Sequence, residues 1–160
     1  RKESTCSAIL GAASLCIVTL SRIPDGWRRS SSARPVWYTF PDREMPYPQG
    51  LKSAAFEFNP AKFLKIPATA FVGENDIRRD DALNTSRGLD SHQGETRVER
   101  GRRWIEAMRA AAAAHQYDTR FEFHTLPWSD HSFFRSVRRG FLAGRVFESL
   151  GLDKPAPRRV

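Results

Sequence analysis

The sequence has few of the residues that hold metal sites or small disulfide-linked domains together. Of its 160 residues only Cys6 and Cys16 are cysteines, too few for a disulfide framework or a four-cysteine zinc site. The four histidines show no metal-ligand spacing with these cysteines. They are His92, His115, His124 and His131. We therefore expect no structural metal and no cofactor.

Long apolar runs are also absent. The longest, residues 8–20, has 13 residues, whereas a membrane-spanning helix needs about 20. A secretory signal fits this length, but Glu3 lies in the part that should be basic, and no small-residue cleavage site follows. A buried strand or helix is the better interpretation. We expect no membrane partner, and a cytoplasmic location is slightly favoured.

Acidic residues are outnumbered, with 18 Asp and Glu against 26 Lys and Arg and a net charge of +8. No basic block is interleaved with aromatic residues, so we expect no nucleic-acid partner. With 40% apolar and 28% charged residues, the composition is that of a globular domain rather than a disordered chain. The sequence opens at Arg1 without a Met, so we expect a fragment or a processed piece.

Two strands are predicted in the second half of the chain. Residues 66–72 form a β-rich run that ends at Gly73, and residues 120–126 alternate apolar and polar side chains. Residues 77–95 are polar and predict an excursion loop between these strands, and a weak helix, broken by Pro60, is predicted over 56–64.

Two helices are predicted after these segments. Over residues 96–115, apolar side chains recur at helical spacing, and the arginines of this helix are expected on its solvated face. These are Arg97, Arg100, Arg102, Arg103 and Arg109. The last helix, residues 133–150, is expected to turn its large apolar side chains inward. These are Phe134, Val137, Phe141, Val146, Phe147 and Leu150.

Strands that alternate with helices predict an α/β fold with a parallel sheet and flanking helices. In such sheets the functional site lies at the carboxyl ends of the strands, where the sequence has Asp76 and His131. Alone, Asp76 is typical of a loop cap or salt bridge, and His131 of a surface histidine. Together they predict an acid–base pair, in which the carboxylate orients the imidazole and stabilises its protonated form.

Four segments carry a resemblance to a known family: WYTFPD, PATAFVGEND, QGETRVERGRRWIEAM and LPWSDHSF. With them, the span from Trp37 to Gly151 resembles the C-terminal half of an α/β-hydrolase of an esterase- and depolymerase-like subgroup. The family's triad runs nucleophile, acid, base along the chain. The resemblance implies a partial α/β-hydrolase fold over 37–151, Asp76 as acid, His131 as base, and a small-molecule ester-like substrate. Residues 152–160, which end in KPAPRRV, are expected to form a tail.

The family's nucleophile motif, G-x-S-x-G, is missing from this sequence. Ser14 follows Gly11 but lacks the second glycine, and Ser30, Ser31 and Ser32 lie in a basic, turn-like run. As written, the chain has two members of a triad and no nucleophile.

A shifted reading frame offers an explanation. If codons are read from the third base of each visible codon, residues 6–11 can encode Phe-Gly-His-Ser-Gly, a nucleophile-elbow sequence. The visible codons needed are TCG for Ser7, GCC for Ala8 and ATT for Ile9. By Trp37 the visible frame is again the one that resembles the family. We therefore interpret residues 1–36 as a frameshifted or disordered segment.

Two functional hypotheses follow. The first is a serine-type ester hydrolase whose acid and base are retained and whose nucleophile is missing, so that the chain as written is inactive. The second is a non-catalytic α/β module or interaction protein with a basic surface. Binding to a polyanion that falls steeply with salt would favour the second.

Overall fold

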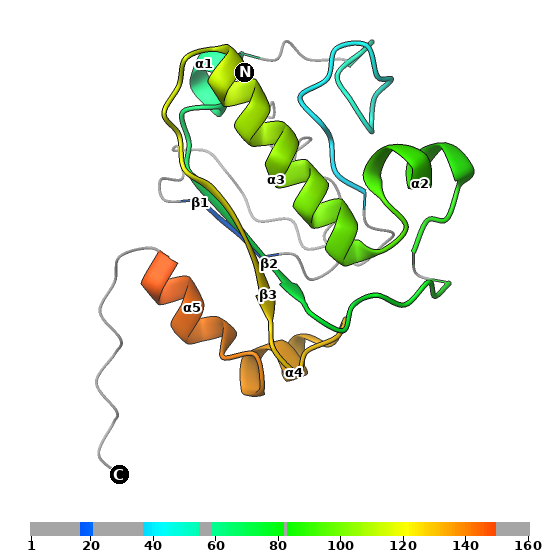
Figure 1. Ribbon diagram of the computed structural model, residues 1–160, viewed down its shortest axis with the longest axis vertical. Coiled ribbons are helices and arrows are strands. Elements are labelled where there is room, and N and C mark those ends of the chain that lie inside the picture. The colour runs from blue at the N-terminus through cyan, green and yellow to red at the C-terminus, as the bar shows by residue number, and fades with distance from the viewer. Residues whose placement is uncertain (1–16, 21–36, 55–58, 82, 150–160) are drawn as a thin grey trace, which may run out of the picture.

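The computed structural model describes residues 17–20, 37–54, 59–81 and 83–149, and Figure 1 shows their arrangement. The elements in chain order are β1 (Ile17–Leu20), α1 (Pro60–Phe63), β2 (Ala68–Gly73), α2 (Arg87–Gln93), α3 (Arg97–Ala114), β3 (Phe121–Leu126), α4 (Phe133–Arg138) and α5 (Leu142–Ser149). No helix among the described residues is both long and apolar enough to cross a membrane.

The sheet has the strand order β1-β2-β3, with β2 at its centre. β2 and β3 run parallel, and their carboxyl ends coincide where Gly73 lies opposite Leu126. This pair confirms the predicted α/β class. β1 pairs with β2 in the antiparallel direction, so the sheet is mixed rather than wholly parallel. An antiparallel edge strand on a parallel sheet is a common arrangement.

The two parallel strands form where their sequence patterns predict them. All six residues of β2 are buried, as expected of an apolar strand that is covered on both faces. In β3, Phe121 and Leu126 are buried while His124 between them is exposed. The predicted strands, 66–72 and 120–126, match the observed bounds within two residues.

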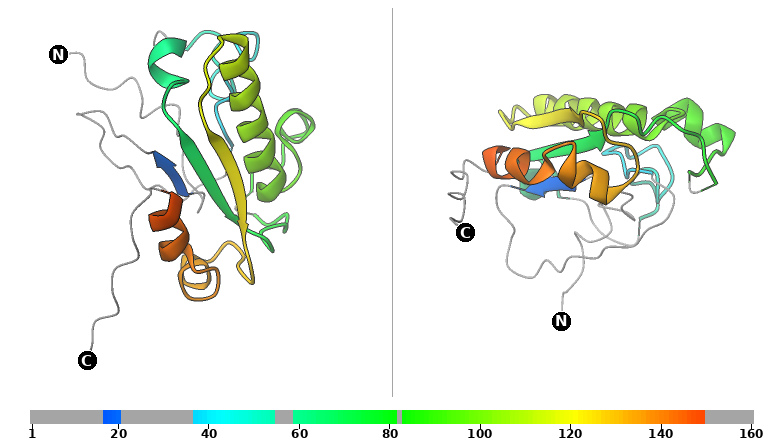
Figure 2. Two further views of the ribbon diagram at one scale, coloured as in Figure 1. Left: turned by 60° about the vertical axis from the view of Figure 1, so that its left-hand side comes forward. Right: turned by 90° about the horizontal axis from the view of Figure 1, so that it is seen from below.

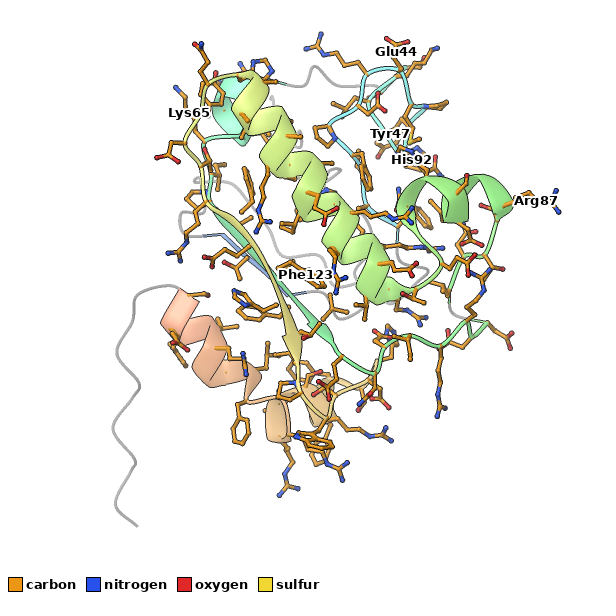
Figure 3. All side chains as sticks on the ribbon, in the orientation of Figure 1. Glu44, Tyr47, Lys65, Arg87, His92 and Phe123 are labelled. Carbon is orange, nitrogen blue, oxygen red and sulfur yellow. The ribbon has the colours of Figure 1, made fainter. Side chains whose placement is uncertain are left out.

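α3 covers one face of the β2–β3 pair. Its first turn is capped by Thr96, whose hydroxyl accepts a hydrogen bond from the backbone N–H of Glu99 at 3.2 Å. The helix buries its apolar stripe against the strands and against residues 38–40, with Phe123 of β3 lying beneath it (Figure 3). The buried residues of the stripe are Trp104, Ile105, Met108 and Ala112. This main core fixes the strands in place.

α4 and α5 lie on the opposite face of the sheet, as the view from below in Figure 2 shows. There Phe71 of β2, Leu126 of β3 and Leu142 of α5 form a second, smaller core, and Val146 packs against it. The flanking-helix arrangement predicted from the sequence is therefore present, with the carboxyl ends of both strands left at the edge between the two helical layers.

The prediction of one last helix over 133–150 is wrong, because the chain breaks between α4 and α5. Gly140 lies at the break, where an added Cβ would meet Ser129 Oγ at 2.6 Å and Ser136 O at 2.8 Å. Phe141 follows in the left-handed region, with φ of 52°. The backbone at Gly140 therefore lies close against Ser129 where the helical path ends.

This break also changes which side chains are buried. Phe134 and Phe141 were expected to face inward, but they are 63% and 67% exposed, and Val137 is exposed too. Val146 and Phe147 are half-buried, and Leu150 lies outside the described residues. The apolar spacing of residues 133–150 is therefore not the spacing of a single buried helical face.

Two further predictions need correction. The excursion at 77–95 contains α2, which is anchored because the Gln93 side chain bonds the backbone of Tyr38 in both directions, at 2.9 and 2.6 Å. Two of the α3 arginines expected in solvent, Arg97 and Arg100, are 2% and 0% exposed. Arg102, Arg103 and Arg109 are exposed as predicted.

The weak helix at 56–64 is shorter than predicted. Pro60 begins α1 rather than breaking a helix, as suits a residue without a backbone N–H. Residues 55–58 lie outside the described residues. So do most of residues 1–36, including both cysteines and the shifted-frame elbow, and the tail predicted at 152–160.

Candidate active site

Asp76 and His131 meet just beyond the carboxyl ends of β2 and β3. Nδ1 of His131 lies 2.9 Å from Oδ2 of Asp76. The Asp76 residue is only 5% exposed, whereas the His131 side chain is 36% exposed. The predicted proximity is therefore present: a buried carboxylate holds one edge of an imidazole ring that solvent can reach. The catalytic role of the pair remains a prediction.

The two loops that carry this pair are joined by hydrogen bonds. The backbone N–H of Glu74 donates to Leu126 O at 3.0 Å, and that of Asn75 donates to Ser129 O at 2.9 Å. In return, the backbone N–H of Trp128 donates to Oε1 of Glu74 at 2.8 Å. The first of these bonds continues the pairing of β2 and β3 past the ends of the strands, and all three fix the loop after one strand against the loop after the other.

Gly73 permits this close approach of the loops. An added Cβ would meet the carbonyl oxygens of Asp130 and Ser129 at 2.6 Å each, well inside any ordinary contact. The backbone of the His131 loop therefore crosses directly over the last residue of β2. Only a residue without a side chain fits at this crossing.

On its other side, the Asp76 carboxylate contacts Arg97, the first residue of α3. Nη1 of Arg97 lies 3.3 Å from Oδ1 of Asp76. The same guanidinium forms a shorter contact with Asp80, whose Oδ1 lies 2.7 Å from Nη2. Asp76 is thus shared between one imidazole and one guanidinium. Such partners offset the cost of burying a carboxylate.

Sequence reasoning missed Arg97 because an arginine on a helix is usually solvated. One topological signal was available. A helix that follows a parallel strand begins near the carboxyl end of that strand, so the first residue of α3 is placed beside the loop that carries Asp76. Asp80 was missed as well, since it lies in the polar stretch predicted as a loop.

A second ionic cluster lies farther along α2 and α3. Arg100 pairs with Asp90 at 2.7 Å, and Arg79 pairs with the other oxygen of Asp90, also at 2.7 Å. The hydrogen bond from Arg79, together with the one from Arg100, holds the pKa of Asp90 below its ordinary value. Burial lowers the pKa of Arg100, and Asp90 opposes that shift. This cluster anchors the excursion before α3.

The remaining histidines lie apart from the Asp76–His131 pair. His92 packs edge-on against Phe40 at 4.9 Å between ring centres, and Figure 3 labels it on α2. His115 stacks on Tyr117 at the end of α3. His124 is exposed on β3, with Nε2 3.5 Å from Oε2 of Glu122. Among the described residues, no group of three or more His, Cys, Asp or Glu side chains could hold a metal ion.

Comparison with known proteins gives a likeness in structure alone. No protein-family profile matches the chain, and no curated protein matches it. The chain is similar to the solved structure of poly(aspartic acid) hydrolase-1 from Sphingomonas sp. KT-1, at 25% identity and a TM-score of 0.56, over 69% of this chain and 40% of that one.

A second similar structure is LpqC, a poly(3-hydroxybutyrate) depolymerase from Bordetella parapertussis. The identity is again 25%, the TM-score is 0.58, and the match covers 75% of this chain and 39% of that one. Both likenesses agree with a hydrolase-like α/β fold. The matched part spans about two fifths of the length of either neighbour.

Proposed function

We propose that this chain is the acid- and base-bearing part of a serine-type ester hydrolase. The observation that carries the proposal is the 2.9 Å contact between Nδ1 of His131 and Oδ2 of Asp76, beyond the ends of two neighbouring parallel strands. The likeness to two polymer-degrading hydrolases supports it. The proposed substrate is a small-molecule ester, with no nucleic acid and no membrane among the partners.

In the proposed reaction, His131 accepts the proton of a serine hydroxyl while the serine oxygen attacks the carbonyl carbon of the ester. Asp76 accepts the hydrogen bond from Nδ1–H, which leaves the other ring nitrogen as the base, and its charge stabilises the imidazolium. The same proton then passes to the departing alcohol as the tetrahedral intermediate collapses. Water repeats both steps on the acyl-serine and releases the acid.

The hydroxyls of the two serines beside His131 are already engaged in hydrogen bonds that stabilise the loop and the start of α4. The hydroxyl of Ser129 is buried and donates to the carbonyl oxygen of Pro127 at 3.1 Å. Ser132 is the N-cap of α4, where its hydroxyl accepts from the backbone N–H of Arg135. Neither hydroxyl is placed as a nucleophile. We therefore propose that the nucleophile belongs to the shifted frame of codons 1–36.

The nucleotide sequence tests this part of the proposal directly. The elbow requires that the codons of Ser7, Ala8 and Ile9 end in G, C and T, respectively. Any other base at one of these positions changes the encoded elbow. Such a result would remove the frameshift explanation, while the Asp76–His131 geometry would stand unchanged.

Activity tests the rest of the proposal. With codons 1–36 returned to the shifted frame, we expect hydrolysis of p-nitrophenyl acetate that depends on both Asp76 and His131. Asp76→Asn removes the charge that orients the imidazole, and triads of this kind then lose up to about 10⁴ in kcat. His131→Ala removes the base itself and should reduce activity at least as strongly.

The chain provides a matched control in its second histidine–carboxylate pair. His124→Ala and Glu122→Gln disrupt a partly exposed pair on β3 and should leave the activity unchanged. If these variants lose as much activity as Asp76→Asn, the assignment of Asp76 and His131 is wrong. In the visible frame, we expect no hydrolysis above that of a His131→Ala control.

A further inference from the structure

We propose that Arg97 is a positioning residue, which holds the Asp76 carboxylate in the orientation that meets His131. The inference rests on the proposed function for its catalytic meaning. Its structural content is separate: without Arg97, the hydrogen bond between Asp76 and His131 is lost even though the fold remains.

The first argument is the short list of groups that bind Asp76. Among the residues that the structure describes, its side-chain oxygens have two hydrogen-bonding partners. Oδ2 meets Nδ1 of His131 at 2.9 Å, and Oδ1 meets Nη1 of Arg97 at 3.3 Å. Rotation of the carboxylate about its Cβ–Cγ bond would break both contacts together. Arg97 is therefore the group that opposes such rotation from the side away from the imidazole.

The second argument is that Arg97 is itself held in place. Its guanidinium makes a two-pronged contact with Asp80, at 2.7 Å from Nη2 to Oδ1 and 3.3 Å from Nη1 to Oδ2. Nη1 also donates to the backbone carbonyl of Arg78 at 3.4 Å. The 2.7 Å contact with Asp80 is the tight one, and the 3.3 Å contact with Asp76 is long. Asp80 therefore acts as the anchor, and Arg97 transmits the constraint to Asp76.

The third argument is the unfavourable location of the arginine. Arg97 is 2% exposed in the first turn of α3, where the helix dipole disfavours a positive charge. Its Nε is buried without a hydrogen-bond partner among the described residues. Neither helix stability nor full satisfaction of its donors accounts for an arginine here. Its contacts with the carboxylates of Asp76 and Asp80 account for it.

Lysine could not take over this role. The contact uses both terminal nitrogens of a planar group to span Asp76 and Asp80. An ammonium group is a single point charge at the end of a flexible chain, and it does not reproduce that fork. The proposal therefore predicts different results for Arg97→Met, which removes the positive charge, and for Arg97→Lys, which keeps the charge but not the planar, two-pronged group.

The experiment uses the chain in its visible frame and records the low-field proton NMR signal of His131 Nδ1–H. A proton held between an imidazole and a carboxylate is deshielded and protected from exchange with water. We expect this signal in the unaltered chain and its loss in His131→Ala, which assigns it. In Arg97→Met we expect the signal to broaden or disappear, while circular dichroism still reports the native secondary structure.

Arg100→Met is the matched control. Arg100 is also fully buried on α3, but its carboxylate partner is Asp90. This variant should lose thermal stability to a similar degree and retain the His131 signal. Arg97→Lys should fold, because it keeps the charge beside Asp80, and its signal should be weaker than that of the unaltered chain.

Several results would overturn the proposal. These are the absence of the signal from the unaltered chain, full intensity in Arg97→Met or Arg97→Lys, and equal loss in Arg100→Met. Should Arg97→Met fail to fold, Arg97→Lys decides the matter alone. In the frame-restored enzyme, Arg97→Lys should lower kcat by about 10-fold to 100-fold, by analogy with the loss when a residue that orients a metal ligand is replaced, with little change in KM. Absence of all esterase activity would refute the proposed function and leave the NMR result standing.

Discussion

Replacing Gly73 with alanine would put a methyl group where the loop after β3 crosses the end of β2. The new Cβ would lie 2.6 Å from two carbonyl oxygens, of Ser129 and Asp130, and ordinary contact begins at 3.4 Å. The obstacle is backbone, so no side-chain rotation relieves the overlap. The loop must therefore move away by about 0.8 Å, the difference between these two distances.

That displacement would reach the site directly, since His131 follows Asp130 while Asp76 lies on the β2 side of the crossing. If all of it passes to the imidazole, the contact between Nδ1 and Oδ2, now 2.9 Å, lengthens to about 3.7 Å, beyond hydrogen-bonding range. Overpacking of this kind also lowers the free energy of unfolding by about 1–3 kcal/mol. We expect both effects in Gly73→Ala.

Urea denaturation measures the stability, and the low-field NMR signal of His131 measures the contact. Gly88→Ala and Gly144→Ala are the controls. An added Cβ at either glycine meets nothing within 4 Å, and both residues lie in helices, so these variants should be unchanged or more stable by up to about 1 kcal/mol. The reasoning fails if Gly73→Ala is as stable as they are and keeps the full signal.

Two further predictions concern the scaffold. Asp90→Asn should lower the free energy of unfolding at neutral pH but not in acid. The reason is that the pKa of Asp90 is lowered in the folded chain. The stabilisation by its carboxylate is therefore complete above about pH 5, and it disappears as the pH falls through and below the unfolded value near 3.9. Urea midpoints of both chains across this pH range would test it, and a constant difference would contradict it. Trp104→Ala should cost about 3–5 kcal/mol, because Trp104 is buried, stacks on Tyr38 at 5.2 Å and donates to Thr39 O. A loss below about 1 kcal/mol in thermal or urea unfolding would contradict it.

The parts of the fold that the sequence predicts well are those with local signals. β2 is a continuous apolar run, β3 alternates, and α3 has a capping threonine followed by apolar residues at helical spacing. The meeting of Asp76 and His131 follows from these elements, since the carboxyl ends of neighbouring parallel strands share one edge.

The parts that it predicts poorly depend on contacts between distant residues. Arg97 and Arg100 look like solvated arginines, and their burial depends on Asp76 and Asp90, which lie in earlier segments. Gly140 looks like a tolerated helical glycine, but at the break it lies against Ser129, a residue that precedes α4 in the sequence. Neither partner can be identified from the neighbouring sequence. The spacing of apolar residues along one helix gives no information on which distant residues pack against that helix.

The hydrogen bonds between the two site loops also decide where the chain can change its length. The backbone N–H of Glu74 donates to Leu126 O with the same offset along the chain as the bond from Ala68 to Arg120 O, and the N–H of Asn75 then donates to Ser129 O. One extra residue in either loop would therefore misalign these bonds. An insertion is better tolerated at an exposed loop position without such bonds, such as Asp81. In hydrogen exchange, the amides of Glu74 and Asn75 should therefore open together with β2 and β3 as one cooperative unit. The site loops therefore unfold only together with the sheet, and they do not open separately from it.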